Sequence, residues 1–519
     1  MVFRSPYADV EIPDASLTDF VLAGAAERGD KPALIDGPTG RTITYAQLAG
    51  GVERVAAGLA ARGFKKGDVF AIFSPNVPEY AVAFHGIARA GGVSTTMNSL
   101  YTVEELAFQL NDSKARFMLT IPQFLDRAQD AAAKSGVEEI FVLGEAEGAT
   151  PFAELLSSDA APPQVDIDPA NDLVALPYSS GTTGLPKGVM LTHRNMVANI
   201  VQASEPHSTS DRDVIIGVLP FFHIYGMNVI MNIAVSLGAT IVTMPRFDLE
   251  EFLTLMQDHK VTRAYLVPPI ILALAKHPIV DKYDLESLEV IMSGAAPLGQ
   301  DLQDAAQARV GSVVMQGYGL TETSPVTHMN SDVAGEGRAG SIGFLIPNTE
   351  SRIVDPASGK ELGPNETGEV WISGPQVMKG YLNNPDATAH TIDEDGWLHT
   401  GDIGYVDSDG FFFLVDRLKE LIKYKGFQVP PAELEAVLLS HPSIADCAVI
   451  PVPDEEAGEI PKAYVVLKEE ISADDIMAFV AERVAPHKKI RLVEFTDEIP
   501  KSASGKILRR VLVDKERAG

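Results

Sequence analysis

Short apolar runs alternate with helix-length segments along most of this chain. A helical spacing of apolar residues from Leu48 to Leu59 precedes the apolar run 69–73, and a second helical pattern begins at Pro78. Further short apolar runs lie at 214–219, 239–242, 264–267, 290–292 and 313–315. Strands that alternate with helices in this way favour largely parallel sheets covered by helices. The pattern therefore predicts a layered α/β architecture.

The chain is long enough for more than one domain. Its 519 residues exceed what one compact core normally supports. Beyond Ser341 the sequence changes to short apolar runs and turns, which indicate a smaller β-rich section. The helical and strand patterns after Asp416 suffice for a small α+β domain. We therefore expect a large N-terminal domain of layered α/β subdomains plus this β-rich section over residues 1–416. A small C-terminal domain is expected over residues 417–519.

Charge and apolar patterning exclude several classes of partner. The chain has 71 Asp and Glu residues against 42 Lys and Arg, a net charge of -29, which argues against nucleic acid or an anionic membrane as a partner. No uninterrupted apolar run reaches the roughly 18–20 residues that cross a bilayer, and the first residues lack a signal-peptide pattern. We expect a cytoplasmic protein without membrane insertion.

Cys447 is the only cysteine of the chain. We therefore expect no intramolecular disulfide, and we interpret Cys447 as a small buried apolar residue.

A loop rich in glycine and hydroxyl groups follows the apolar run 173–176. The segment 178–188 reads YSSGTTGLPKG. Glycines let backbone N–H groups approach an anion, and hydroxyls and a lysine add donors, so the loop suits a polyphosphate. Its spacing does not match a Walker A motif. We expect it to connect a buried strand to an apolar helical segment. The candidate phosphate ligands are Ser179, Ser180, Gly181, Thr182, Thr183, Gly184 and Lys187.

Six further motifs follow this loop. They read FFHIYG from Phe221, SGAAPL from Ser293, QGYGLTETSP from Gln316, HTGD from His399, DRLKELIKYKGFQV from Asp416 and PKSASGKILRR from Pro500. Together with the loop, they resemble the ordered signature of adenylate-forming (AMP-binding) enzymes, the superfamily of acyl-CoA synthetases, luciferases and peptide-synthetase adenylation domains. The pattern is most similar to that of 4-coumarate–CoA ligases and their bacterial relatives.

The resemblance implies an acid–thiol ligase that uses ATP, Mg²⁺ and coenzyme A (CoA). Such an enzyme joins a carboxylic acid to AMP with release of pyrophosphate and then transfers the acyl group to CoA. Lys506 resembles the catalytic C-terminal lysine of the family, although from the residues alone an exposed lysine before a basic helix is the simpler interpretation. Glu322 resembles the metal-binding glutamate, with Thr182 as a second candidate ligand. A solvated surface glutamate is the alternative.

Further nucleotide contacts are implied by the same resemblance. Asp402 matches the acid that holds the ribose hydroxyls, although an Asp after a glycine also suits a turn. Arg417 matches a second ribose or phosphate contact. The other positions that match nucleotide contacts of the family are Gln316, Gly317, Tyr318, Thr321 and Gln428.

The resemblance places the acyl pocket beside the FFHIYG motif, where His223 is a candidate catalytic residue. A core histidine is the alternative. Gly226 replaces an alanine of the plant pattern, and we expect it to change the depth of the pocket. An apolar slot without an evident buried basic partner favours an aryl or medium-chain aliphatic acid. The implied acyl and acyl-AMP contacts are His223, Tyr225, Val229, Gly294, Ala295, Pro325, Val326, Lys419 and Lys423. The implied CoA contacts are Arg246, Lys425 and Gly426.

Two lysines of the small domain are implied to serve successive half-reactions at one site. Lys506 belongs to the first and Lys425 to the second. We therefore hypothesise that the C-terminal domain is mobile and rotates between the steps, with a hinge near Lys419. The alternative is that the lysines of residues 419–425 only form a solvated surface.

Several functions stay open at this point. Hydroxycinnamates such as 4-coumarate are the leading substrate candidates, followed by other aryl acids, and a medium- or long-chain fatty acyl-CoA synthetase is an alternative. A luciferase-like oxygenase and an adenylation enzyme that loads a carrier protein share the first half-reaction. A non-catalytic binding protein is disfavoured because the lysine, carboxylate and arginine positions of the signature are all present. Both a monomer and a homodimer are compatible with the sequence.

Overall fold

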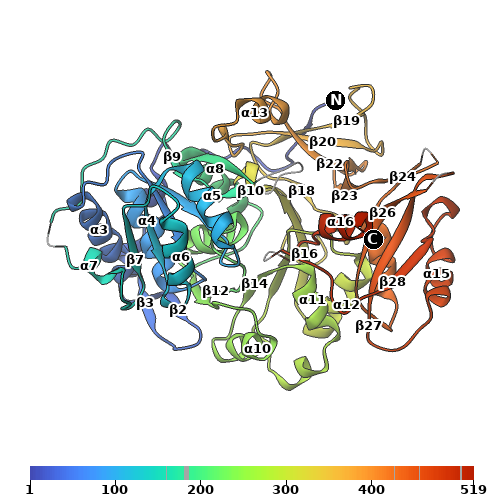
Figure 1. Ribbon diagram of the computed structural model, residues 1–519, viewed down its shortest axis with the longest axis horizontal. Helices are drawn as coiled ribbons and strands as arrows, with labels where there is room; N and C mark the ends of the chain where they lie inside the picture. Colours follow the sequence, from blue (N-terminus) through green and yellow to red (C-terminus); the bar gives the residue numbers. More distant parts are fainter. Residues whose placement is uncertain (159, 180–185, 426, 455, 503–504, 519) are drawn as a thin grey trace.

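The structure is a computed structural model that describes residues 1–158, 160–179, 186–425, 427–454, 456–502 and 505–518. A large N-terminal domain and a small C-terminal domain lie side by side, and both mix helices with sheets (Figure 1). The predicted fold class is therefore confirmed. The predicted boundary between residues 416 and 417 falls before the last residue of β23 (Phe412–Arg417), and β24 (Ile422–Tyr424) begins after residue 421.

The first large sheet carries both flanks of the phosphate loop at one edge. Its strand order is β10-β11-β9-β5-β4-β6-β7-β8, with β21 beside β11. The strands are β4 (Val69–Phe73), β5 (Val93–Thr96), β6 (Ala115–Thr120), β7 (Glu139–Val142), β8 (Thr150–Pro151), β9 (Leu173–Ala175), β10 (Tyr178–Ser179), β11 (Lys187–Thr192) and β21 (Gly380–Tyr381). The helices of this part are α3 (Tyr45–Ala61), α4 (Pro78–Arg89), α5 (Val103–Ser113), η1 (Pro122–Phe124), α6 (Leu125–Ala132) and α7 (Ala153–Leu156).

Helix α3 shows how local sequence produces these elements. The Thr44 hydroxyl accepts the amide N–H of Gln47, and the Gln47 side-chain oxygen accepts the amide N–H of Thr44, which closes a capping box. The helically spaced apolar residues from Leu48 to Leu59 are buried. This apolar face packs against α4. The cap therefore fixes where the helix begins, and burial of its apolar face stabilises it.

The segment after the phosphate loop corrects one prediction. Residues Lys187–Thr192 form β11, which pairs with β10 in an antiparallel register that sets Ser179 opposite Lys187. Helix α8 (His193–Ser204) begins only after this strand. The loop therefore connects two strands of a hairpin rather than a strand and a helix. The apolar run after Lys187 is too short for its periodicity to separate strand from helix.

The second large sheet brings two of the motifs together. Its order is β18-β17-β16-β15-β14-β12-β13-β2-β3. β15 and β16 are parallel and set Ser293 opposite Gln316, so the segments that follow these strands meet at one edge. The strands are β2 (Pro32–Asp36), β3 (Thr42–Thr44), β12 (Val214–Gly217), β13 (Thr240–Thr243), β14 (Arg263–Leu266), β15 (Val290–Ser293), β16 (Val313–Gly319), β17 (Val326–Met329) and β18 (Phe344–Leu345).

The helices of this second layer include α8 and a run of helices that continue along the chain. They are the π-helix η2 (Tyr225–Ile233), α9 (Ala234–Leu237), α10 (Leu249–Asp258), α11 (Pro268–Lys276), η3 (Pro278–Lys282), α12 (Gln300–Val310) and η4 (Thr321–Thr323). The short helices α1 (Leu17–Val21) and α2 (Ala25–Arg28) precede the first long helix. Figure 1 shows α11 and α12 beside the C-terminal domain.

The predicted β-rich section beyond Ser341 forms a separate sheet with the order β1-β19-β20-β22-β23. Its strands are β1 (Phe3–Arg4), β19 (Glu350–Val354), β20 (Gly368–Ser373), β22 (Leu398–Val406) and β23, and α13 (Pro385–Thr391) lies between two of them in the chain. Its last strand leads directly into the C-terminal domain. This sheet therefore supplies the connection between the two domains.

The C-terminal domain has its own sheet and core. The strand order is β25-β24-β27-β26, with β28 beside β27. Cys447 is 1% exposed within this core, which confirms its prediction as a buried residue. The strands are β24, β25 (Phe427–Val429), β26 (Ile444–Asp454), β27 (Gly458–Leu467) and β28 (Leu492–Phe495). The helices are α14 (Pro431–Ser440), α15 (Ala473–Ala481), η5 (Pro486–Lys488) and α16 (Arg509–Ala518).

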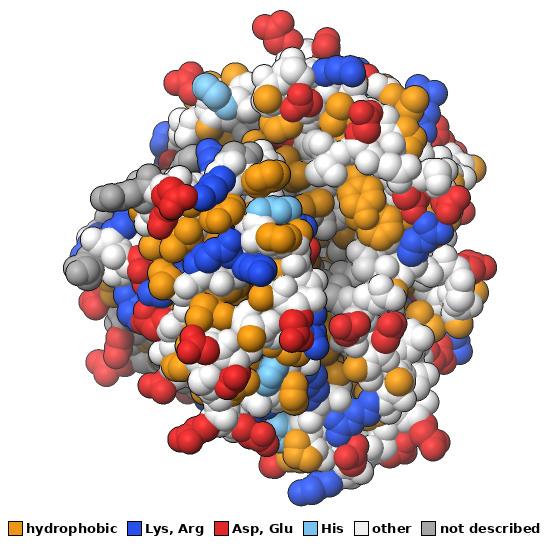
Figure 2. Space-filling model, turned by 90° about the vertical axis from the view of Figure 1, so that its right-hand side faces the viewer, with side chains coloured by type: hydrophobic (Ala, Val, Ile, Leu, Met, Phe, Trp, Pro, Cys, Tyr) orange, Lys and Arg blue, Asp and Glu red, His pale blue; other side chains and the backbone are white. Residues whose placement is uncertain are grey.

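The surface is mixed in charge. Figure 2 shows acidic and basic side chains intermixed over the face that includes the C-terminal domain. Of the helices in the described part of the chain, none combines the length and the apolar character needed to cross a membrane.

Candidate active site

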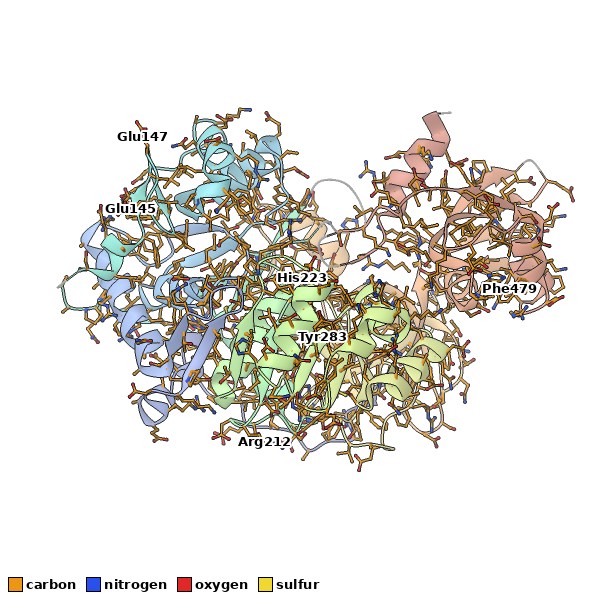
Figure 3. All side chains as sticks on the ribbon, turned by 90° about the horizontal axis from the view of Figure 1, so that it is seen from below. Glu145, Glu147, Arg212, His223, Tyr283 and Phe479 are labelled. Atoms are coloured by element: carbon orange, nitrogen blue, oxygen red, sulfur yellow. The ribbon has the colours of Figure 1, made fainter. Side chains whose placement is uncertain are left out.

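One cavity of about 1090 Å³ is lined by residues of both domains. Figure 3 shows His223 near the middle of the molecule and Phe479 in the separate lobe that the C-terminal domain forms. The cavity collects most of the motifs found in the sequence. The predicted site residues that line it are Ser179, Lys187, His223, Tyr225, Val229, Gly294, Ala295, Gly317, Tyr318, Thr321, Glu322, Pro325, Val326, Arg417, Lys419 and Lys506.

Other predicted residues lie elsewhere. Lys423 and Gln428 face each other across the β24–β25 hairpin, where both side chains are exposed. Lys425 is exposed at the tip of that hairpin and pairs with Glu456. Arg246 is exposed just after β13. The predictions for Ser180, Gly181, Thr182, Thr183, Gly184 and Gly426 fall outside the residues that the structure describes.

Lys506 enters the cavity from the C-terminal domain. Its loop is closed by hydrogen bonds to Ser502, whose hydroxyl accepts the amide N–H of Lys506 at 3.1 Å and whose own amide N–H donates to the Lys506 carbonyl at 2.8 Å. Gly505 has a φ of +77°, and a Cβ there would lie 3.1 Å from Val267. The loop therefore rests directly on the start of α11 in the large domain.

The charge of Lys506 is tuned by its surroundings. Burial lowers the pKa of Lys506 to about 8, and the neighbouring Arg417 acts in the same direction, while Glu420 and Asp402 oppose it. A buried ammonium close to other cations loses its proton more readily because the charged form is poorly solvated. Lys506 therefore changes charge as the pH passes through about 8.

This tuning predicts a pH dependence for the step that needs the charged lysine. We expect kcat/KM for acyl-AMP formation to fall as the pH rises through about 8, because the neutral amine cannot attract two anions. A pH profile of pyrophosphate exchange measures this fall. In Lys506→Arg the falling limb should move to higher pH, since a guanidinium stays charged. An unchanged limb in that variant would assign the titration to another group.

His223 presents a neutral imidazole to the cavity. The amide N–H of Tyr225 donates to its Nδ1 at 3.3 Å, so Nδ1 is an acceptor and the ring proton resides on Nε2. Burial lowers the pKa of His223 to about 4, and the positive charge of Lys506 contributes. His223 is therefore a hydrogen-bond donor rather than a cation at neutral pH.

Glu322, Tyr381 and Lys187 form a cluster beside the phosphate loop. The Tyr381 hydroxyl donates to Glu322 Oε1 at 2.9 Å, and Lys187 Nζ lies 4.7 Å from the centre of the Tyr381 ring. Glu322 is 7% exposed. Within the described ranges, no group of three or more His, Cys, Asp or Glu residues is arranged to hold a metal ion. A single carboxylate beside a polyphosphate site nevertheless fits Mg²⁺, which takes most of its oxygen ligands from phosphate and water.

Asp402 lies just behind the cavity wall. The Tyr318 hydroxyl donates to Asp402 Oδ2 at 2.5 Å, and Arg417 Nε lies 3.4 Å from Oδ1. The pairing of β22 with β23 sets Asp402 opposite Arg417. Burial raises the pKa of Asp402, while Arg417 acts against this rise. Two paired strands of one sheet thus hold an acid and a base at one side of the cavity.

Gln316 is absent from the described residues that line the cavity, and its side chain has a structural contact instead. Gln316 Oε1 accepts the amide N–H of Leu298 at 2.9 Å, and Nε2 donates to the Leu298 carbonyl at 3.1 Å. These bonds brace the SGAAPL segment, which carries Gly294 and Ala295 into the cavity wall. Gln316 therefore positions that wall.

Two family models match parts of the two domains that line the site. The AMP-binding enzyme model matches residues 22–382, and the AMP-binding enzyme C-terminal domain model matches residues 433–506. This chain belongs to the AMP-binding enzyme family. The resemblance inferred from the motifs is therefore confirmed.

Relatives of this AMP-binding enzyme extend over its whole length. It is 48% identical over 530 residues to 4-coumarate–CoA ligase 3 of Oryza sativa subsp. japonica, which covers 100% of this chain and 96% of the relative. The structure of the anthranilate CoA ligase AuaEII in complex with anthranoyl-AMP matches with a TM-score of 0.91 at 26% identity and covers 98% of both chains. ATP-bound MatB from Rhodopseudomonas palustris matches with a TM-score of 0.87 at 30% identity and covers 96% of this chain and 99% of that chain.

Sequence reasoning missed Tyr381 in this AMP-binding enzyme. Tyr381 lies in the two-residue strand β21, far in sequence from both Glu322 and Lys187, and no local pattern marks it. The pairing of β21 with β11 brings it beside the phosphate loop. A contact of this kind follows from strand order rather than from a motif.

Gly226 acts differently from its prediction. It does not occur among the described residues of the cavity lining, and a Cβ at this position would lie 2.1 Å from the Pro220 carbonyl oxygen. The expectation that Gly226 changes pocket depth is therefore corrected. The glycine allows the first turn of η2 to pack on the backbone at Pro220.

The close packing of Gly226 predicts a loss of stability on substitution. We expect Gly226→Ala to lower the free energy of unfolding by about 1–3 kcal/mol, because the added methyl group forces a backbone shift. Denaturant unfolding measures this change. Gly136→Ala is the matched control, since a Cβ at Gly136 meets nothing within 4 Å. If Gly226→Ala changed the preference among acid substrates but not the stability, Gly226 would affect the depth of the pocket as first expected.

Proposed function

We propose that this enzyme is an ATP-dependent acid–CoA ligase that activates a hydroxycinnamate-type or other aryl acid as its acyl-AMP. The observation that carries the proposal is the position of Lys506, which reaches into one cavity together with His223, Lys187 and Glu322. Residues for a nucleotide, for a polyphosphate and for an acid are thereby collected at one place. ATP and CoA are substrates, and Mg²⁺ accompanies the phosphates.

The first half-reaction joins two anions. A carboxylate oxygen of the acid attacks the α-phosphorus of ATP, the bond to the β-phosphate breaks, and pyrophosphate leaves with the electron pair. At about 4 Å, two unit charges repel by about 4 kcal/mol at an effective dielectric near 20. Lys506 offsets this repulsion as a cation that bridges both anions, and it stabilises the charge that develops at the phosphorus.

Polar residues of the large domain, together with Arg417 at the domain boundary, hold the nucleotide in this step. Lys187 and the phosphate loop bind the β- and γ-phosphates, while Asp402 and Arg417 hold the ribose. Glu322 would hold Mg²⁺, which neutralises phosphate charge when bound. The Nε2–H of His223 donates to the carboxylate and later to the acyl oxygen of the adenylate.

The second half-reaction requires a different face of the C-terminal domain. The CoA sulfur attacks the acyl carbon after its proton is lost to solvent, the bond to AMP breaks, and AMP leaves. Lys425, Gly426 and Arg246 are the proposed CoA contacts, and Lys423 and Gln428 approach the acyl-adenylate. The side chains of Lys423, Lys425 and Gln428 are exposed while Lys506 occupies the cavity. The C-terminal domain beyond Lys419 therefore rotates about this residue between the steps.

The acyl end of the cavity favours an uncharged ring or chain. The Tyr225 hydroxyl donates to the Met292 carbonyl at 3.3 Å, so the tyrosine presents mainly its ring to the substrate. A Cβ at Gly294 would lie 2.8 Å from that ring, so the ring packs directly against the backbone there. The lining residues of this end are Tyr225, Val229, Met292, Gly294, Ala295, Pro325 and Val326. Their uncharged character and the kinship with plant 4-coumarate–CoA ligases favour 4-coumarate.

A panel of acids tests this proposal. AMP release should depend on both CoA and the acid, and 4-coumarate should give the highest kcat/KM among 4-coumarate, benzoate, anthranilate, octanoate and malonate. If octanoate gave the highest kcat/KM, the proposed substrate class would change from an aryl acid to a fatty acid, which the apolar wall would also accommodate. AMP release that is unaffected by CoA would contradict thioester formation.

A further inference from the structure

Helix α14 of the C-terminal domain is held at both ends by side chains of the large domain. At its start, Asp416 Oδ2 accepts the amide N–H of Ala432 at 2.8 Å. At its end, Lys276 Nζ donates to the carbonyl of Leu439 at 3.0 Å. Asp416 belongs to β23 and Lys276 is the last residue of α11, so both contacts join the large domain to one helix of the small domain.

Each contact places a charge of the favourable sign at its end of α14, an acid at the start and a lysine at the end. The first N–H groups of a helix carry partial positive charge and its last carbonyls partial negative charge, so an acid at the start and a base at the end both stabilise it. The residue before α14 is Pro430, which makes no side-chain cap. Asp416 therefore supplies a cap that the sequence of α14 itself lacks.

Arg509 connects α14 to the segment that carries Lys506. Arg509 Nη2 lies 2.6 Å from Glu435 Oε2 on α14, and Arg509 also pairs with Glu420. Arg509 is only three residues beyond Lys506, at the start of α16. Since the Lys506 loop rests on Val267 at the start of α11, α11 contacts the lysine loop at one end and α14 at the other.

We propose that Asp416 and Lys276 are positioning residues that clamp α14 and thereby hold Lys506 in the cavity for acyl-AMP formation. The proposal rests on the proposed function, because it concerns which half-reaction the clamped orientation serves. Both clamp residues lie within 1–416, whereas α14 lies within 417–519. Rotation about Lys419 must therefore break both hydrogen bonds before the second half-reaction.

Variants of the clamp separate the two half-reactions. We expect Lys276→Met and Asp416→Ala each to slow single-turnover acyl-AMP formation about fivefold, which corresponds to about 1 kcal/mol and is the usual effect of losing a helix cap. Thioester formation from supplied acyl-AMP should be unchanged or faster. The effects should multiply in the double variant, because the contacts lie at opposite ends of a ten-residue helix.

Matched variants control for a general loss of structure. Lys282→Met removes a nearby lysine of the same domain and should leave both half-reactions unchanged. Asp416→Asn should retain most of the first half-reaction, because asparagine caps helices about as well as aspartate. If Asp416→Ala does not fold, Lys276→Met alone still tests the clamp, since Lys276 is an exposed side chain.

The failure of the clamp and the failure of the proposed function give different results. Equal slowing of both half-reactions in Lys276→Met, or no change in either, would overturn the clamp while the unmodified enzyme remains a ligase. An unmodified enzyme that forms neither acyl-AMP nor thioester would instead overturn the proposed function.

Discussion

Lys506→Ala should slow acyl-AMP formation by a factor on the order of 10²–10³ and leave thioester formation from supplied acyl-AMP nearly unchanged. The ammonium group of Lys506 reaches the cavity from the C-terminal domain in the orientation described above. Its removal restores the repulsion between the acid and the α-phosphate. In the second half-reaction that repulsion no longer exists, because the acyl group and the phosphate are already joined.

Single-turnover assays of the two half-reactions measure this split. Acyl-AMP formation is followed with labelled ATP, and thioester formation is followed after addition of prepared acyl-AMP and CoA. Lys468→Ala provides a control, because Lys468 is an exposed lysine of the same domain. An equal loss of both half-reactions in Lys506→Ala would show that the lysine supports the fold or both steps, and would remove its assigned role.

The second large effect is expected from Lys419→Pro. The turn after β23 is held in this orientation by amide N–H groups of Leu418 and Glu420, which donate to Gly401 and Arg417 at 2.9 Å. Residue 419 donates neither of these bonds, so proline there removes neither donor, and acyl-AMP formation should be impaired less than thioester formation. A rotated domain needs other backbone angles there, and a misplaced proline costs about 3 kcal/mol, a factor on the order of 100 in thioester formation.

The same half-reaction assays test this prediction. Lys419→Ala is the matched control, because it removes the side chain but leaves the backbone free to turn. Both variants lose the Lys419 side chain that lines the cavity, so the effect of that loss is common to them, and only the proline variant should accumulate acyl-AMP. Equal impairment of both steps by proline would argue against a hinge at this position.

Elements with strong local periodicity could be predicted from the sequence. The apolar run 69–73 forms β4 with the same bounds, and the helical spacing from Leu48 to Leu59 lies within α3. Both are determined by side chains that are neighbours in the chain. The strand β11 was predicted as helical because its few apolar residues continue directly into α8.

The site could be predicted only in part, because several contacts join distant segments. The motifs identified Lys187 and Glu322, but Tyr381 joins them only through the pairing of β21 with β11. Gln316 was expected near the nucleotide, and its bonds to Leu298 depend on how β16 lies beside the SGAAPL segment. The sequence also contained both sets of lysines without specifying which set faces the cavity. That distinction depends on the orientation of a whole domain.

Exchange of labelled pyrophosphate into ATP tests the central claim most directly, because it requires reversible acyl-AMP formation and no CoA. With 4-coumarate, Mg²⁺ and the unmodified enzyme, label should enter ATP at a rate that depends on the acid, and Lys506→Ala should abolish most of it. If no acid of the panel supported exchange by the folded enzyme, acyl-AMP formation at this cavity would be contradicted.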